Sequence, residues 1–395
     1  MMPNTPTTGD CIAMLERLVA FDTTSRNSNL PLIHDVQNLL AEIGIESRLT
    51  YNDEKTKANL WATIGPKDRG GIVLSGHTDV VPVDGQEWTS DPWTLTERDG
   101  KLFGRGSADM KGFVACCIAH AQHMRDADLK IPFHFAFSHD EEIGCAGVLP
   151  LVYDMRDNLP LPQAAIIGEP TSMQIIGGNK GGIGFTTTIT GTDGHSSLPE
   201  QGANSIFAAA KMIVYLQEMQ ERLKRDADPQ NGFDPYYTSV DCGIIRGGTA
   251  HNVIPAETVV NWGFRTTPFD DGAALAKEVH DYCANELEPA MKAISEECGF
   301  HHKPRHEVPG LKPVETSAAE HLVRHLSGLN HSGRVSYGAE AGHFQNAGVP
   351  SVIYGPGNIE QAHAPDEFIH VSQMDACNAF LFDLTVWATK NSDIL

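Results

Sequence analysis

Long apolar runs are missing from this chain of 395 residues, and their absence argues against an integral membrane protein. No stretch approaches the roughly 18 consecutive apolar residues that span a bilayer. Residues 1–6 (Met-Met-Pro-Asn-Thr-Pro) contain neither the basic region nor the apolar core of a signal peptide. We therefore expect a cytoplasmic protein without a membrane partner.

Positive charge is also scarce. Lys and Arg total 29 against 51 Asp and Glu, which gives a formal net charge of −22. A field of this sign repels phosphate backbones and argues against a nucleic-acid partner. It tolerates divalent cations and cationic substrates, although acidity by itself demonstrates neither.

Cysteine motifs are missing as well. The chain has eight cysteines, and none forms a Cys-x-x-Cys pair. This spacing argues against a zinc site made of thiolates. Because the cysteines lie in apolar or helical segments, we expect them to be buried and reduced.

The first part of the chain does contain an alternation of strand and helix signals. Residues 72–74, 133–137 and 164–167 are short apolar runs typical of buried strands. Residues 110–125 and 144–155 have helical patterns. Strands that alternate with helices predict an α/β sheet with parallel portions.

The pattern changes at the glycine-rich segment 177–182, which is typical of a hinge. It is followed by a long predicted helix at about 204–225 and by strands at 240–245 and 257–265. A β-α-β-β-α order of this size can form a compact domain of its own. The Pro-rich stretch 303–313 would be the return hinge.

The predicted fold class is therefore an α/β catalytic domain whose mixed sheet is flanked by helices, interrupted by a smaller inserted α+β (ferredoxin-like) domain. The catalytic domain would comprise residues 1–182 and 308–395, and the inserted lid or dimerisation domain would comprise residues 183–307.

His77 and Asp79 are the first pair of chemically active side chains after a strand signal. On an extended chain, residues two apart face the same side. The Asp79 carboxylate could therefore hold the imidazole of His77 in one tautomer. A single His-x-Asp is nevertheless a weak indication of a metal site.

Four further segments place carboxylates or histidine where a sheet would end. Asp109 lies between a glycine-rich loop and a helix start, where a helix cap is an equally good interpretation. The others are Glu141 with Glu142, Glu169 and His363. Open α/β sheets place their sites at such strand ends. Oxygen ligands with two imidazoles suit zinc, and cobalt or manganese could replace it.

The ordered motifs are recognisable as a set. Residues 75–82 (Ser-Gly-His-Thr-Asp-Val-Val-Pro), 104–112 (Gly-Arg-Gly-Ser-Ala-Asp-Met-Lys-Gly), 140–144 (Asp-Glu-Glu-Ile-Gly) and 168–171 (Gly-Glu-Pro-Thr) resemble those of the dizinc aminoacylase/carboxypeptidase family. The resemblance covers nearly the whole chain. It implies a hydrolase that uses two zinc ions per subunit to cleave a small amide.

The resemblance also implies a role for each motif residue. One zinc ion would be held by His77, Asp109 and Glu169, and the other by the bridging Asp109 with Glu142 and His363. Glu141 would be the general base, and Asp79 would orient His77. The family typically has a cis peptide bond after the bridging aspartate, here Asp109–Met110.

The inserted segment matches the same family. Residues 194–199 resemble its lid motif, whose histidine, here His195, reaches the active site of the partner subunit in a homodimer. Residues 247–255 and Arg265 resemble the substrate-binding strands. Arg265 would hold the α-carboxylate of an N-acyl amino acid, with the assistance of Asn252.

Within the family, segments 338–344 and 355–363 look most like the acetylornithine deacetylases. This implies hydrolysis of N-acetyl-L-ornithine to ornithine and acetate, a step of arginine biosynthesis. Glu340 could contact the δ-ammonium group, or it could be a structural carboxylate. Succinyl-diaminopimelate desuccinylase, general aminoacylase and dipeptidase activities remain alternatives. A non-catalytic relative is a further alternative, but the ligands and the base are all present.

Overall fold

A computed structural model describes residues 5–394, and the chain forms two compact units. The main unit contains the chain up to Gly178, Leu311–Arg334 and the chain from Ala339 onward. The inserted unit contains Asn179–Gly310 and Val335–Gly338. The boundaries predicted from the sequence, after residues 182 and 307, lie four residues later and three residues earlier, respectively, than those observed. The short return of 335–338 to the inserted unit has no signal in the sequence.

The main unit is built on an eight-stranded mixed sheet with the order β1-β2-β6-β3-β7-β16-β8-β15. Its centre is parallel, because β3 pairs in parallel with β6 and β7, and β16 pairs in parallel with β7. The flanking pairs β1–β2, β2–β6 and β8–β16 are antiparallel. The strands are β1 (Ser47–Tyr51), β2 (Ala58–Ile64), β3 (Ile72–His77), β6 (Phe133–Ser138), β7 (Ala164–Ile167), β8 (Ile176–Asn179), β15 (Gly333–Val335) and β16 (Ser351–Ile353).

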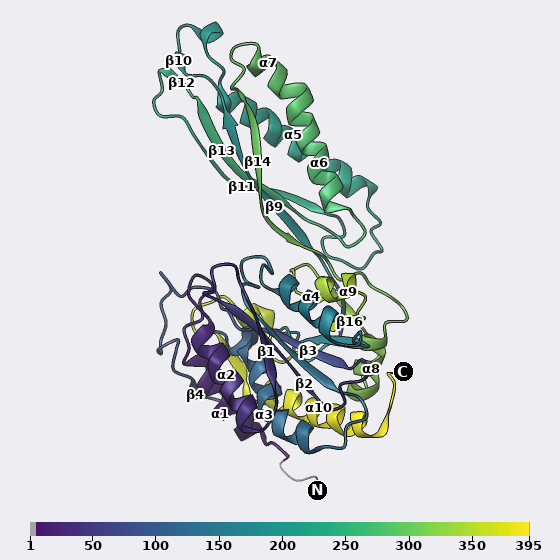
Figure 1. Ribbon diagram of the computed structural model, residues 1–395. Helices are drawn as coiled ribbons and strands as arrows, with labels where there is room; N and C mark the ends of the chain where they lie inside the picture. The colour runs from purple at the N-terminus through teal and green to yellow at the C-terminus, as the bar shows by residue number, and fades with distance from the viewer. Residues whose placement is uncertain (1–4, 395) are drawn as a thin grey trace. The chain divides into compact units, whose positions relative to one another are not determined.

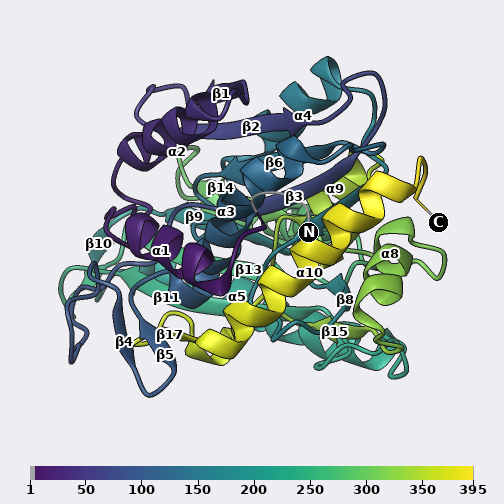
Figure 2. The ribbon, with the colours of Figure 1, turned by 90° about the horizontal axis from the view of Figure 1, so that it is seen from below.

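Helices cover both faces of this sheet (Figure 1). On one face, α1, α2, α3, α8 and α10 form a large apolar core with alternate strand residues such as Phe133 and Phe135. Figure 2 shows α10 lying along α3 beside α1. On the other face, α4 packs on β1, β2 and β6 and contacts α9. The helices are α1 (Thr8–Val19), α2 (Leu30–Glu42), α3 (Gly112–Asp126), α4 (Val148–Asn158), α8 (Ala318–Ser327), α9 (Ala341–Asn346) and α10 (Val371–Lys390).

The inserted unit is a four-stranded antiparallel sheet with helices on one face. The strand order is β11-β13-β9-β14. Alternation explains the packing, since Ile183, Phe185 and Ile189 of β9 enter the core with α5 and α6. The elements are β9 (Gly182–Thr190), β11 (Ser239–Gly247), β13 (Glu257–Arg265), β14 (Gly299–Val308), α5 (Ser205–Asp226), α6 (Gly272–Tyr282) and α7 (Glu288–Lys292), with the short pair β10 (Gly194–His195) and β12 (Val253–Ile254).

The predicted fold class is confirmed, and each of the two predicted hinge segments contains a boundary between the units, but local structure differs from the prediction at three places. Residues 303–308 of the Pro-rich hinge belong to edge strand β14, whose irregular register between Pro304 and His306 accommodates the proline. Most of the glycine-rich segment 177–182, which contains the other boundary, likewise pairs as strand. Helix α4 begins only at Val148, because residues 144–147 form turns.

Most of the cysteines are buried, as their positions in apolar or helical segments suggested. All eight cysteines are free; Cys242 is half-buried, and the other seven are buried. Within residues 5–394, no helix combines the length and the apolar character needed to cross a bilayer. A small three-stranded sheet, β4 (Thr96–Arg98), β5 (Lys101–Phe103) and β17 (Phe368–His370), completes the main unit.

Candidate metal centre

The carboxyl ends of three parallel strands bring most of the candidate side chains together. His77 is the last residue of β3. Glu141 and Glu142 follow β6, and Glu169 follows β7. Because these strands are parallel neighbours, their ends meet at one edge of the sheet. Asp109 arrives from the irregular turn before α3, and the Asp109–Met110 peptide bond is cis.

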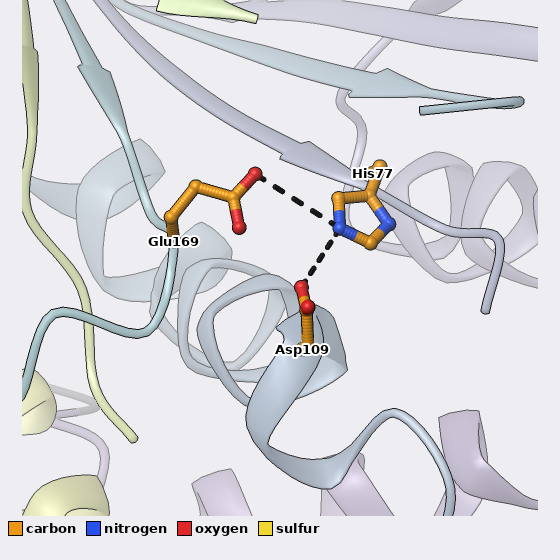
Figure 3. Close-up of side chains that lie close together, drawn as sticks. All are labelled: His77, Asp109 and Glu169. Atoms are coloured by element: carbon orange, nitrogen blue, oxygen red, sulfur yellow. Dashed lines mark hydrogen bonds and ion pairs between the residues drawn. The ribbon is translucent and has the colours of Figure 1, made fainter. Parts of the chain in front are cut away.

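His77, Asp109 and Glu169 form the first group of potential metal ligands (Figure 3). The Nε2 atom of His77 lies 3.0 Å from Asp109 Oδ1 and 4.0 Å from Glu169 Oε1. All three side chains are buried. They therefore present one nitrogen and two oxygens to a single enclosed point.

Asp109, Glu142 and His363 form a second group that shares the same aspartate. His363 Nε2 lies 3.0 Å from Glu142 Oε2 and 3.3 Å from Asp109 Oδ2. Asp109 thus directs Oδ1 to one histidine and Oδ2 to the other. This is the arrangement expected of a carboxylate that bridges two ions. About half of the His363 side chain is exposed, so this group opens to solvent.

The charges of the cluster show why it would accept cations. Burial and the neighbouring Asp109 raise the pKa of Glu142 to about 7. Burial, then Asp109, raises the pKa of Glu169 well above its usual range. Hydrogen bonds to Asp109 and Glu142 raise the pKa of His363 to about 10. In the metal-free protein, bound protons therefore offset the negative charge of these closely spaced carboxylates, and a cation could replace them.

Two carboxylate oxygens of the same residues also suit a bound metal ion. Glu142 Oε1 and Glu169 Oε1 are buried and have no hydrogen-bond partner among the described residues. Such orphaned carboxylate oxygens are costly unless a cation or a proton meets them. Two imidazoles and three carboxylates without a thiolate are a suitable donor set for a divalent transition metal.

Asp79 contacts His77 differently from the expectation. The Nδ1 atom of His77 lies 2.9 Å from the backbone carbonyl oxygen of Asp79, whereas the nearer carboxylate oxygen is 3.7 Å away. The carboxylate instead accepts hydrogen bonds from the backbone N–H groups of Glu141 and Glu142 and from the Ser25 hydroxyl. Asp79 thus orients His77 through its main chain and holds the following glutamates through its side chain.

Glu141 is the carboxylate beside the cluster that belongs to neither group of ligands. Its Oε1 accepts a hydrogen bond from the Cys145 thiol. Burial raises its pKa to about 8; His77 opposes this shift, while Glu142, Asp109 and Glu340 reinforce it. A carboxylate with a pKa near neutrality can both accept and return a proton at physiological pH.

Glu340 is more deeply buried than a contact with substrate would suggest. It is 1% exposed. One of its oxygens accepts a hydrogen bond from the Ser138 hydroxyl, and Oε2 accepts one from the Ser75 hydroxyl at 3.3 Å. Because Ser75 lies in β3 and Ser138 ends β6, this carboxylate joins the two strands that precede His77 and Glu141. These contacts favour the structural alternative for Glu340.

Glu367 is a residue of the site that the sequence motifs did not indicate. One oxygen accepts hydrogen bonds from the backbone N–H groups of Ala108 and Asp109, at 3.0 and 3.1 Å. The other accepts them from Gly106 N at 3.0 Å and from Arg105 Nη1 at 2.6 Å. Four donors thereby fix the turn that carries the shared aspartate. The position of Glu367, four residues after His363, was the only signal in the sequence.

Three predicted residues belong to the inserted unit. His195 and Asn252 are neighbours, since the Ser196 backbone N–H donates to the Asn252 carbonyl oxygen and β10 pairs with β12. Arg265 lies at the far end of the nine-residue strand β13. Asn252 therefore lies beside His195, near the opposite end of β13 from Arg265 of the same chain. Both His195 and Asn252 are exposed.

Comparison with known proteins agrees with this geometry. The model of peptidase family M20/M25/M40 matches residues 73–386. The chain is 35% identical to an acetylornithine deacetylase of Myxococcus xanthus over 379 residues, which cover 93% of this chain and 95% of the relative.

Solved structures share the fold at low sequence identity. A metallo-carboxypeptidase of the M20 family from Sulfolobus solfataricus superposes with a TM-score of 0.74 at 15% identity, covering 96% of this chain and 99% of that one. A dinuclear metal-binding peptidase of the same family from Bacillus subtilis gives a TM-score of 0.63 at 19% identity and covers 96% and 98%.

The family predicted from the motifs is thereby confirmed, and with it the prediction of a metal-dependent hydrolase. The match extends over most of the chain, including all the main-unit residues of the cluster. The chain belongs to peptidase family M20/M25/M40 and is a metallo-hydrolase of that family.

Proposed function

We propose that this protein hydrolyses N-acetyl-L-ornithine to ornithine and acetate with two zinc ions per subunit. The observation that carries the proposal is the position of Asp109, whose two carboxylate oxygens face two separate groups of ligands. Similarity to acetylornithine deacetylases over nearly the full length supports the choice of substrate.

The proposed ligands are those that the geometry groups together. His77, Asp109 and Glu169 would hold one ion, and Asp109, Glu142 and His363 the other. Two such ions supply Lewis acidity and lower the pKa of a bound water from 15.7 to about 7.

Glu141 is the proposed general base. Its carboxylate would take a proton from the attacking water and then deliver it to the nitrogen of the leaving amine. Three features support this role: burial, a pKa of about 8, and a position outside both ligand groups. Asp79 would keep Glu141 in place through the backbone hydrogen bond at 3.1 Å. Glu340 would stabilise the strand ends rather than bind the substrate's ammonium group.

The inserted unit would contribute recognition. Arg265 can hold a carboxylate in a bidentate fork. His195 would donate a hydrogen bond to the developing oxyanion. The nine residues of β13 span far more than one small substrate at about 3.4 Å per residue. His195 and Arg265 of one chain therefore cannot serve one small substrate together, which supports a homodimer in which His195 acts in the partner's site.

Apolar surface on the inserted unit supports the same dimer. Phe207 near the start of α5 is 68% exposed, and Val214, two turns later, is 52% exposed. A groove of about 610 Å³ borders this helix and is lined by apolar side chains including Val253 and Ile294. Exposed apolar patches of this kind mark interfaces. We propose that a second copy of the chain covers the surface.

A panel of substrates tests the proposed reaction. Amine release would be measured for N-acetyl-L-ornithine, N-acetyl-L-methionine, N-succinyl-diaminopimelate and a dipeptide, using chelator-treated protein with and without added zinc. We expect kcat/KM to be highest for N-acetyl-L-ornithine and activity to require the metal. Preference for another substrate would contradict the proposed specificity and leave the metal mechanism intact.

Mixing inactive variants tests the dimer. His195→Ala and Glu141→Ala each disable one function, so a mixed dimer has one site with an intact base and an intact partner histidine. We expect each variant alone to be inactive and partial activity to return on mixing. If no activity returns although light scattering shows mixed dimers, His195 does not act in the partner's site.

A further inference from the structure

On the face of the inserted sheet that its helices do not cover, Gly182, Gly184 and Gly263 form a patch without side chains, which is called the floor below. Ile183 and Phe185 of β9 point into the helical core, so the alternate residues Gly182 and Gly184 face the other way. Gly263 of β13 pairs with Gly184. A methyl group on Gly184 would lie 2.5 Å from the His306 ring, and one on Gly263 would lie 2.5 Å from a backbone oxygen. The backbone contact requires glycine at position 263, and at position 184 the His306 ring fills the space that a side chain would need.

A cavity of about 230 Å³ lies over this floor. Its charged or titratable lining residues are Arg265 from β13, Arg305 and His306 from β14, and Asp241 from β11. The irregularity of β14 between Pro304 and His306 inserts Arg305 as an extra residue opposite β9. The cavity is small for a whole ligand, since small-molecule pockets usually reach about 300–1,000 Å³. It has the size for one end of a substrate.

The two arginines of this cavity differ in their pairing from arginines elsewhere in the chain. Among the described residues, no carboxylate forms a hydrogen bond or an ion pair with the guanidinium group of Arg265 or of Arg305. By contrast, Arg105 in the main unit is paired with Glu367, and Arg222 of α5 is paired with Glu278. Both side chains are exposed, so a ligand can reach their guanidinium groups.

The positive charges of Arg265 and Arg305 also act on His306. Burial, then Arg265 and Arg305, lowers the pKa of His306 below its usual value. Its ring packs over Gly184 and is half-buried. His306 is therefore neutral near pH 7 and can donate one hydrogen bond beside two positive charges. With Asp241 counted, the lining keeps a net positive charge.

We propose that Arg305 and His306 join Arg265 in a carboxylate-binding pocket that recognises the carboxylate end of the substrate. The proposal rests on the proposed deacetylase function, and it adds two specificity-determining residues from β14 that the motifs did not indicate. Two guanidinium groups offer the planar, charge-assisted hydrogen bonds that carboxylates prefer. Asp241 would disfavour ligands with more negative charge than one carboxylate.

The test compares a substrate with its uncharged analogue. N-acetyl-L-ornithine and its carboxamide would be assayed with wild-type protein and with Arg305→Ala, Arg265→Ala and His306→Ala. Lys303→Ala is the matched control, because Lys303 is an exposed cation on the same strand that does not line the cavity.

We expect Arg305→Ala to lower kcat/KM for the acid about tenfold, mainly through KM, as for the loss of one hydrogen bond to a charged group. For the carboxamide, kcat/KM of Arg305→Ala should differ less than twofold from that of wild type. For the acid, kcat/KM of Lys303→Ala should likewise differ less than twofold from that of wild type. Equal losses for acid and carboxamide, or equal losses in Arg305→Ala and Lys303→Ala, would overturn the proposal.

A binding measurement separates this proposal from the proposed function. Metal-free protein does not turn over, so the affinity for N-acetyl-L-ornithine and for its carboxamide can be measured by calorimetry or by ligand-detected NMR. Stronger binding of the acid that disappears in Arg305→Ala supports the pocket even if the holoenzyme fails to cleave this substrate. Equal binding of acid and carboxamide to wild-type protein contradicts it.

Discussion

The two units of this protein present opposite electrostatic designs. At the strand ends of the main unit, the four carboxylates of Asp109, Glu141, Glu142 and Glu169 lie close to two imidazoles, and the raised pKa values of the three glutamates show that the carboxylates repel one another without cations. On the inserted sheet, Arg265 and Arg305, which have no carboxylate partner among the described residues, line a cavity over a floor of glycines. The first arrangement suits chemistry on a metal, and the second suits recognition of an anionic group. The difference predicts that variants in the main unit lower kcat or metal affinity, whereas variants in the inserted pocket raise KM.

The largest effect is expected for Glu141→Gln. The amide keeps the shape of the side chain and removes the base, so kcat should fall by about 10²- to 10⁴-fold. Metal content, measured by elemental analysis, should stay unchanged because Glu141 belongs to neither ligand group. Activity close to that of wild type would remove Glu141 from the mechanism. Arg265→Ala provides the contrast, with a larger effect on KM than on kcat.

Glu367→Gln should weaken metal binding by about 10- to 100-fold, the usual cost of removing a group that positions a ligand. The amide cannot accept all four hydrogen bonds that fix the Asp109 turn, and it leaves Arg105 without its charge partner. Zinc affinity would be measured by competition with a chromophoric chelator. Glu360→Gln, an exposed glutamate between Asn358 and His363, is the control and should bind zinc like wild type.

The affinity for zinc should also decrease as the pH is lowered. Burial and Asp109 raise the pKa of Glu142 to about 7, so below that pH its carboxylate is protonated in the metal-free protein. Zinc must then displace this proton, and affinity should fall about tenfold per pH unit for each proton displaced. Titrations at pH 6 and 7 would measure the slope. In Glu142→Gln one proton fewer is displaced by zinc, so the dependence of log affinity on pH should become less steep by about one unit per pH unit. An unchanged slope would show that another group titrates.

The smallest effect is expected in the core of the inserted unit. The His302 ring stacks on His280 at 4.0 Å, and Thr187 Oγ1 lies 2.8 Å from its Nδ1. Burial, then His280, lowers the pKa of His302 to about 4. As the pH falls, His302 is therefore protonated in the unfolded chain before it is protonated in the folded protein. The contribution of neutral His302 to the free energy of unfolding is present above about pH 6.5 and is lost between pH 6.5 and 4.

Partial exposure reduces this contribution to the order of 1–2 kcal/mol. Denaturant unfolding of the metal-free protein at pH 7 and pH 5 would measure it. His302→Phe should weaken the pH dependence of the transition assigned to the inserted unit. An equally steep dependence in the variant would mean that other groups cause the acid sensitivity.

The side chains of the candidate metal centre could be found in the sequence because most of them occupy short motifs directly after apolar strands. His77, Glu141 and Glu169 follow three such strands, and parallel pairing makes their meeting predictable. The supporting carboxylates could not be found in this way. Glu340 meets Ser75 and Ser138 across 265 and 202 residues, and Glu367 meets Asp109 across 258 residues.

The inserted unit was predicted less completely for a different reason. A proline in β14 suggested a hinge, although an edge strand with an irregular register tolerates it. Only the register of β9, β13 and β14 brings Gly184, Arg265 and His306 to one face. Likewise, periodicity placed Asp79 beside His77 but could not show that the backbone carbonyl makes the contact.

Counting metal ions against activity tests the central claim most directly. Chelator-treated protein would be titrated with zinc while hydrolysis of N-acetyl-L-ornithine and bound metal are measured together. We predict that activity rises to full value at two ions per chain, and that His363→Ala binds only one ion and is nearly inactive. Full activity in the metal-free protein, or two tightly bound ions in His363→Ala, would contradict a catalytic site built by Asp109 between two metals.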